Sequence, residues 1–295
     1  METVAIASGK GGTGKTFFSA VLAQILSLPP YNFKVLLADL DFQGPNLHHY
    51  LSSQNYFSLS HYLKEGMSLK SCIEETSFPN LKFLKAGESY QEPSPLKFYE
   101  RQKLIKVFSS LEGYDFLILD LPSGSDFNVL DFLLWVRKKI LVTNLDSLAL
   151  ENLFYLLKKL LLRSLKDFLK DFDPKVKEEI ENSLKEFCKD RRGFSEIINF
   201  LATFSLEIEE KVLEHFSSLE IFLVFNRLRG QERGEGKKFF SQMKFSLSYL
   251  NLRLLGEIFS DLNLILKKEK RISPSFLTPS VYFCFQEIAE KLVKG

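Results

Sequence analysis

The chain has 295 residues, of which 45% are hydrophobic and 26% are charged, a composition typical of a globular protein and not of a disordered one. Lys and Arg total 39 and Asp and Glu total 37, so the formal charge of +2 argues against nucleic-acid wrapping as the main activity. The length fits a doubly wound α/β fold that forms one unit, and we expect a single domain over 1–295.

The first predicted strand leads directly into a glycine-rich motif. Residues 3–8 are short, apolar and β-branched, Gly9 to Thr16 read G-x-x-x-x-G-K-T, and an apolar helical stretch begins at Phe17. Glycines let successive backbone N–H groups turn toward phosphate oxygens, and the helix N-terminus adds partial positive charge. We expect Lys15 to reach the β- and γ-phosphates and Thr16 to bind Mg²⁺. The predicted phosphate-binding residues are Gly11, Gly12, Thr13, Gly14, Lys15, Thr16 and Phe17.

Aspartates follow the next two predicted strands. A strand over 33–38 ends at Asp39 and Asp41, and a strand over 115–120 ends at Asp120. Ligands of open α/β sheets bind outside the carboxyl ends of the strands, so these carboxylates lie where a ligand would bind. Asp120, which is followed by a Pro/Gly turn, should hold Mg²⁺. A single aspartate here is more often a turn or N-cap residue, but three of them downstream of a phosphate loop favour a functional site.

Two further strands are expected over 139–143 and 221–225. The second of these ends at Asn226 and Arg227. The final stretch places apolar residues on one face of a helix, which indicates a core helix. Strands that alternate with helices predict a mostly parallel, doubly wound sheet flanked by helices.

These motifs resemble those of the MinD/ParA ATPases, whose deviant Walker A loop is similar to KGGTGKT here. The resemblance covers roughly 1–160 and 218–295 and is closest to the MinD and FlhG-like branch. It implies a P-loop NTPase fold of the SIMIBI type. It also implies that Lys10 reaches the nucleotide of a second subunit, that Asp41 orients the attacking water, and that Asp39 lies near the metal.

The same resemblance gives roles to the later motifs. The amide of Asn226 would hydrogen-bond to the edge of the adenine base, with Arg227 beside it. Gly124, in the turn after Asp120, would bring a backbone N–H close to the γ-phosphate. The implied catalytic set is Lys10, Lys15 and Asp41, and the implied metal set is Thr16, Asp39 and Asp120.

About seventy residues separate the helix that starts near Leu148 from the strand at Ile221, where the family usually has one helix and a short turn. We expect a helical insertion over 163–215. The long helix should end near Phe172, and three more helices should follow within 174–190, 193–204 and 205–217. The basic, amphipathic stretch 153–172 could lie on a membrane, but packing against the sheet is the favoured interpretation.

The three cysteines are far apart and form no C-x-x-C pair, which indicates a reducing compartment and argues against a cysteine-built metal site. The adjacent His48 and His49 lack the spacing of helical zinc ligands. No apolar run approaches the ~18–20 residues of a membrane span, and the N-terminus does not resemble a signal peptide. We therefore expect a cytoplasmic protein.

The leading functional hypothesis is an ATP-binding and hydrolysing switch that dimerises with ATP and Mg²⁺ and recruits or positions a protein partner through 163–215. Turnover should be slow without that partner. Peripheral attachment at the inner membrane is compatible with the resemblance, although no membrane-targeting tail follows the last predicted helix. The alternatives are a ParA-like ATPase that binds DNA non-specifically, an Mrp-type iron–sulfur carrier and a non-hydrolysing scaffold. The missing C-x-x-C pair disfavours the carrier, and the three aspartates disfavour the scaffold.

Overall fold

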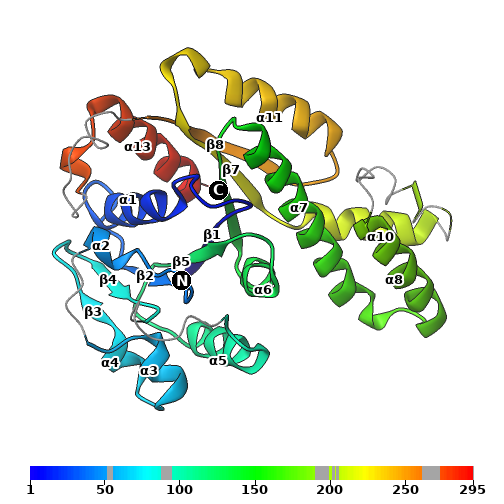
Figure 1. The fold of residues 1–295 in the computed structure, drawn as a ribbon, viewed down its shortest axis with the longest axis horizontal. Coiled ribbons are helices and arrows are strands. Elements are labelled where there is room, and N and C mark those ends of the chain that lie inside the picture. Colours follow the sequence, from blue (N-terminus) through cyan, green and yellow to red (C-terminus); the bar gives the residue numbers. More distant parts are fainter. Residues whose placement is uncertain are drawn as a thin grey trace.

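The protein is described by a computed structural model that covers residues 1–51, 56–87, 95–189, 199–200, 203, 206–260 and 273–294. Its centre is an eight-stranded sheet with the order β3-β4-β2-β5-β1-β6-β7-β8 (Figure 1). Every neighbouring pair is parallel except the edge pair β3–β4. The strands are β1 Glu2–Ser8, β2 Val35–Asp39, β3 Glu74–Glu75, β4 Leu81–Leu84, β5 Phe116–Ser123, β6 Lys138–Thr143, β7 Ile221–Leu228 and β8 Leu252–Phe259.

Two hydrophobic cores lie on the two faces of this sheet, because alternate side chains of each strand point to opposite faces. In β1, Val4 and Ile6 pack into one core, while Ala5 and Ala7 pack into the other. The helices that cover the first face are α1 Lys15–Ser27, α2 His48–Leu51 and α13 Pro279–Lys294. Those that contribute to the second core include α5 Phe98–Ser109, α6 Phe127–Trp135, α7 Ser147–Phe168 and α11 Glu235–Ser246.

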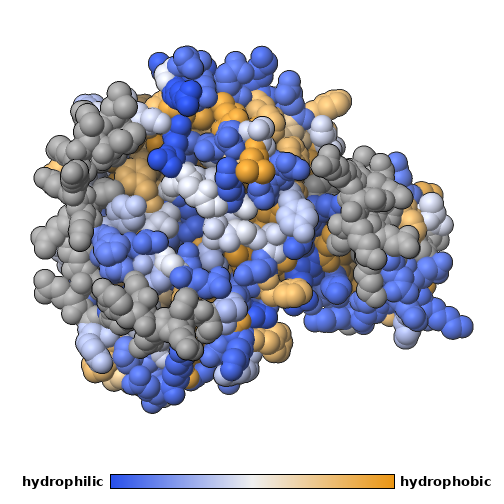
Figure 2. All heavy atoms as spheres, viewed as in Figure 1, coloured by the Kyte–Doolittle hydropathy of each residue, from blue (hydrophilic) through white to orange (hydrophobic). Residues whose placement is uncertain are grey.

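The remaining described helices are short or lie to one side. They are α3 Leu59–Lys64, α4 Leu69–Cys72, α8 Pro174–Lys189, α10 Leu206–Ser217 and the 3₁₀ turns Leu169–Asp171, Gly230–Glu232 and Pro274–Phe276. Figure 1 shows α8 and the far half of α7 projecting away from the sheet, and Figure 2 shows mostly hydrophilic side chains over the lower part of this projection. No helix of the described part is both long and apolar enough to cross a membrane.

The doubly wound, mostly parallel sheet predicted from the sequence is confirmed, and each of the five expected strands is present, while β8 was not expected as a strand. The edge pair β3–β4 was not expected. The long helix α7 ends at Phe168, and the 3₁₀ turn Leu169–Asp171 continues it almost to the predicted end. The start of α8 at Pro174 and the extent of α10 match the expected helices. The helix expected over 193–204 lies largely outside the described residues.

Helix α7 is amphipathic, as its sequence predicted. Its leucines from Leu153 to Leu165 are buried in the second core, whereas Phe154 and Tyr155 are exposed, and the helix packs against α6 and β6. The prediction that this stretch packs against the sheet is therefore correct for its apolar face.

Candidate functional site

The loop between β1 and α1 adopts a conformation that only glycine accommodates easily. Gly12 and Gly14 have φ angles of 85° and 83°, in the left-handed region. A Cβ atom on Gly14 would collide with the side-chain amide of Asn226, and one on Gly9 would collide with the backbone carbonyl of Asn152 in α7. The loop is therefore closely packed between β7 on one side and α7 on the other.

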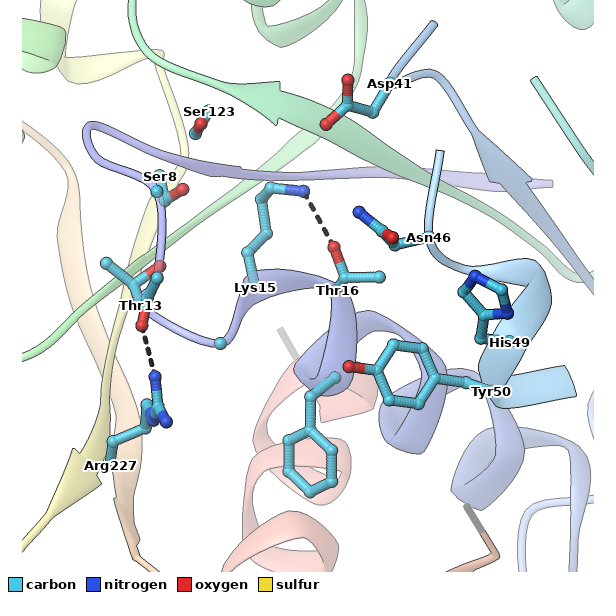
Figure 3. A pocket seen from close by; sticks show the side chains of 14 residues that line it. Ser8, Thr13, Lys15, Thr16, Asp41, Asn46, His49, Tyr50, Ser123 and Arg227 are labelled. Carbon is cyan, nitrogen blue, oxygen red and sulfur yellow. Dashed lines mark hydrogen bonds between the residues drawn. The ribbon is translucent and has the colours of Figure 1, made fainter. Parts of the chain in front are cut away.

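A pocket of about 430 Å³ lies beside this loop, at the carboxyl ends of the strands (Figure 3). In the space-filling view the middle of the face shown carries residues of intermediate hydropathy, with both hydrophobic and hydrophilic side chains around them (Figure 2). Ligands of open α/β sheets bind at this position. The lining residues are Ser8, Gly11, Gly12, Thr13, Gly14, Lys15, Thr16, Phe17, Asp41, Asn46, His49, Tyr50, Ser123 and Arg227.

A buried ion pair lies beneath the pocket. The ammonium of Lys15 donates to Oδ1 of Asp120 at 2.8 Å, and the hydroxyl of Ser19 donates to the same oxygen at 2.7 Å. Lys15 and Asp120 are only 6% and 1% exposed. Ser19 follows Lys15 by one helical turn, so helical spacing could have revealed its place on the same face of α1.

A second carboxylate lies next to this pair. Asp39 is fully buried at the end of β2 and is the register partner of Asp120 in β5. Burial, and then the negative charge of Asp120, raise the pKa of Asp39 to about 8, although the N–H of Asp41 donates to it at 2.9 Å. Two buried carboxylates thus share one lysine, and this arrangement favours an added cation.

The residues present fit a bound Mg²⁺. Its preferred ligands in proteins are oxygen atoms, and Asp39 and Asp120 lie side by side. The Lys15 ammonium that donates to Asp120 also lies 3.4 Å from the hydroxyl of Thr16, a residue that lines the pocket. The pocket also suits phosphate. Ser8 and Thr13 line it, and their buried hydroxyls have no hydrogen-bond partner within the described structure. An occupant rich in acceptor oxygens would satisfy such groups.

Asp41 lies at the rim of the pocket, at the start of a tight turn (Figure 3). Its Oδ1 accepts the N–H of Gln43 at 3.3 Å and that of Gly44 at 2.9 Å. Asn46 then closes the turn by donating to the carbonyl of Gly44 at 2.7 Å. The sequence-predicted Asp41 is therefore in the pocket, whereas Asp39 and Asp120 lie beneath it.

Lys10 does not line the pocket. Its ammonium lies 3.4 Å from Oδ1 of Asp146, the residue that caps the N-terminus of α7, and both side chains are exposed. The N–H of Ala149, and then Lys10, hold the pKa of Asp146 below its usual value. Within the subunit, Lys10 is thus directed to α7 and not to its own pocket.

The residues predicted from the later motifs contact the loop itself. The N–H of Gly124 donates to the carbonyl of Ser8 at 2.8 Å. Asn226, which is 2% exposed, donates its amide to the carbonyl of Thr13 at 2.9 Å. Arg227 has a left-handed φ of 61° and donates to the carbonyl of Gly12 at 2.6 Å.

Of these three residues, Arg227 alone is among those that line the pocket. In this structure Asn226 and Arg227 therefore hold the phosphate loop in place. Sequence reasoning missed His49 and Tyr50, which enter the pocket from α2. No spacing pattern in that short helix pointed to them.

A phosphate loop of this conformation, at the carboxyl edge of a parallel sheet, defines a P-loop nucleotide-binding protein. The family model of the CobQ/CobB/MinD/ParA nucleotide binding domain matches residues 4–273, so the chain belongs to this family.

Among curated proteins, the chain is 32% identical over 125 residues to an uncharacterized ATP-binding protein of Methanocaldococcus jannaschii, an alignment that covers 42% of this chain and 45% of that protein. It is 28% identical over 125 residues to an iron–sulfur cluster carrier protein of Rickettsia felis, covering 42% of this chain and 37% of that protein. The chain thus spans about half the length, or less, of these relatives.

Among solved structures, the septum site-determining protein MinD of Pyrococcus horikoshii, complexed with Mg-ADP, is similar along almost its whole length. The TM-score is 0.61 at 22% identity, and the alignment covers 99% of this chain and 96% of that chain. This likeness concerns the fold.

Proposed function

We propose that the protein is an ATPase that acts as a molecular switch, with ATP and Mg²⁺ bound in the pocket beside the β1–α1 loop. The observation that carries this proposal is the buried group of Lys15, Asp39 and Asp120 directly beneath the pocket. Two carboxylates with one lysine are suited to a divalent cation, and the lysine above them is suited to phosphate.

The loop residues have distinct roles in this proposal. Backbone N–H groups from Gly11 to Phe17 surround the phosphates, and Lys15 exchanges its contact with Asp120 for the β- and γ-phosphate oxygens. Thr16, Asp39 and Asp120 would hold Mg²⁺, which would supply positive charge beside the phosphates.

Asp41 is the proposed water-positioning residue. Both N–H groups that bond to its side chain go to Oδ1, and among the described residues no hydrogen bond goes to Oδ2. A water held by this carboxylate would attack the γ-phosphorus as the bond to the β,γ-bridging oxygen breaks, giving ADP and phosphate. Because Asp41 belongs to the turn 41–44, loss of phosphate would also release that turn.

We further propose that two subunits meet across their pockets. Lys10 is exposed, lies outside its own pocket and pairs only with the exposed Asp146 among the described residues. An exposed ion pair is weak, so Lys10 can leave it for the phosphates of a second copy at small cost. The helical stretch 163–215 is the proposed contact region for a protein partner, because its described helix α8 and the end of α7 project away from the sheet (Figure 1).

The alternative of an iron–sulfur carrier has less support. Cys72 belongs to the core on one face of the sheet, and Cys284 packs against the core on the other face. These two thiols cannot ligate one cluster within a subunit. DNA binding would instead use exposed cations around α11, such as Arg229, Arg233 and Lys237, and a salt-sensitive shift of plain duplex DNA with ATP would favour that alternative.

The test of the ATPase is the Asp41→Ala variant. It should bind Mg-ATP as tightly as the wild type but hydrolyse it at least about tenfold more slowly, because water is no longer positioned. Asp115→Ala is the matched control, since this carboxylate accepts the N–H of Lys34 at the opposite edge of the sheet. Phosphate release and nucleotide affinity are measured for each protein. Hydrolysis at the wild-type rate by Asp41→Ala would refute the role of this residue.

A further inference from the structure

One wall of the pocket comes from a segment that carries no nucleotide-binding motif. Helix α2 follows the turn at Asp41, and it places His49 and Tyr50 among the lining residues. The side chain of Tyr50 extends from α2 across the pocket, with its hydroxyl below Thr16 in the view, and Arg227 lies on the opposite side (Figure 3).

Core residues and backbone hydrogen bonds around Tyr50 hold its ring in place. Leu47 and Leu51 on either side of it are buried in the core under α1, and the Tyr50 ring packs against the same core. The N–H of Leu47 donates to Oδ2 of Asp39 at 3.3 Å, and the N–H of Tyr50 donates to the carbonyl of Leu47 at 3.0 Å. The ring therefore has an apolar base and a polar tip, as amphipathic side chains at pocket walls commonly do.

The chemistry of the pocket shows what the hydroxyl can do there. The groups that line it are mainly donors: the loop N–H groups, Lys15 and Arg227. Burial raises the pKa of the Tyr50 phenol, the charge of Asp120 raises it further, and Arg227 opposes this. The phenol thus keeps its proton at neutral pH and remains a hydrogen-bond donor. Within the described structure the hydroxyl forms no hydrogen bond.

We infer that Tyr50 is a nucleotide-binding residue whose hydroxyl donates a hydrogen bond to a phosphate oxygen of the bound nucleotide. This inference rests on the proposed function, in which the pocket binds ATP and ADP. Leu47, next to α2, donates its N–H to Asp39. A hydrogen bond from Tyr50 to phosphate would therefore connect the bound nucleotide to the segment that carries Asp39 and Asp41.

The experiment compares Tyr50→Phe with Tyr31→Phe. Tyr31 is a matched control because its ring packs against the same core, but its hydroxyl donates to the carbonyl of Gln286 and does not line the pocket. Calorimetric titration with Mg-ADP and with a non-hydrolysable Mg-ATP analogue gives the dissociation constants. We expect Tyr50→Phe to bind both about tenfold more weakly, as for a lost hydrogen bond to a charged group, and Tyr31→Phe to bind as the wild type does.

A second readout separates a phosphate contact from a structural role. The melting temperature without nucleotide should be the same for Tyr50→Phe and the wild type, while the rise in melting temperature at a fixed nucleotide concentration should be smaller for the variant. Equal affinities of Tyr50→Phe and the wild type would overturn the contact alone. If the wild type itself binds neither nucleotide, or if Lys15→Ala binds as the wild type does, both the contact and the proposed function are overturned.

Discussion

The amino ends of the strands (the amino edge) and their carboxyl ends (the carboxyl edge) both bury ionisable side chains. The two edges differ in the hydrogen-bond partners that these side chains find. At the amino edge, the ammonium of Lys138 donates to the carbonyl of Leu292 at 2.6 Å, and that of Lys139 donates to the carbonyl of Val136 at 2.9 Å. Each of these buried lysines thus has acceptors supplied by the chain itself.

At the carboxyl edge, Lys15 pairs with Asp120, while Asp39 lies beside Asp120 without a lysine of its own among the described residues. The pocket hydroxyls of Ser8 and Thr13 have no partner in the described structure. Burial of ionisable side chains alone therefore does not mark a ligand site. An excess of buried acidic groups over basic ones, together with polar atoms that lack a partner, distinguishes the carboxyl edge from the amino edge.

If nucleotide binds at the carboxyl edge alone, loss of a buried lysine should weaken nucleotide binding there and not at the amino edge. Lys15→Ala should weaken binding of a Mg-ATP analogue at least about a hundredfold, because a charge-assisted contact to phosphate is lost. Lys138→Met removes a buried ammonium at the amino edge and should leave the affinity unchanged. Calorimetric titration measures both. Similar affinities for the two variants would contradict the distinction between the edges.

The amino edge can be examined through its pH dependence. Burial lowers the pKa of Lys139 to about 8, an effect that Glu220 partly opposes. Between about pH 8 and the usual lysine pKa, the unfolded chain binds more protons than the folded one, so the free energy of unfolding rises with pH in that window. The gain should reach up to about 3 kcal/mol and should be missing from Lys139→Met. Urea unfolding at several pH values measures it. Parallel pH profiles for the two proteins would refute the assignment.

The carboxyl edge also depends on the close approach of α7 to the phosphate loop. A Cβ on Gly9 would collide with the carbonyl of Asn152, so Gly9→Ala should lower the free energy of unfolding by about 1–3 kcal/mol and weaken nucleotide binding. Gly230→Ala is the control, because a Cβ on Gly230 would meet no atom within 4 Å. Chemical denaturation compares the two variants. A Gly9→Ala protein as stable as Gly230→Ala would show that the contact is readily relieved.

Local sequence predicted much of the fold because the main signals are short. The strand, glycine loop and helix around Gly9 are neighbours in the chain, and each apolar strand that ends in an aspartate or asparagine was recognised. Strand β4 was missed because its four residues carry no motif. The strand order was also beyond local reasoning, since it places β5 between β1 and β2 through contacts of distant segments.

The site was predictable to a similar extent. Gly11 to Phe17, Asp41 and Arg227 do line the pocket, and Asp39 and Asp120 lie under it. The contact of Lys15 with Asp120 joins residues 105 positions apart, so no spacing rule could supply it. Tyr50 was missed because its role depends on where the turn after Asp41 sends the chain. The nucleotide-binding roles of all these residues remain predictions.

The packing of Gly9 against α7 has a mechanical consequence. Helix α7 has 22 residues and is therefore a rod about 33 Å long, held near one end by the phosphate loop. Its other end passes through a single 3₁₀ turn into α8. A tilt of about 5° at the loop would swing that far end by about 3 Å. If the loop binds phosphate as proposed, a small adjustment there would become a displacement of several ångströms at the proposed partner-binding stretch.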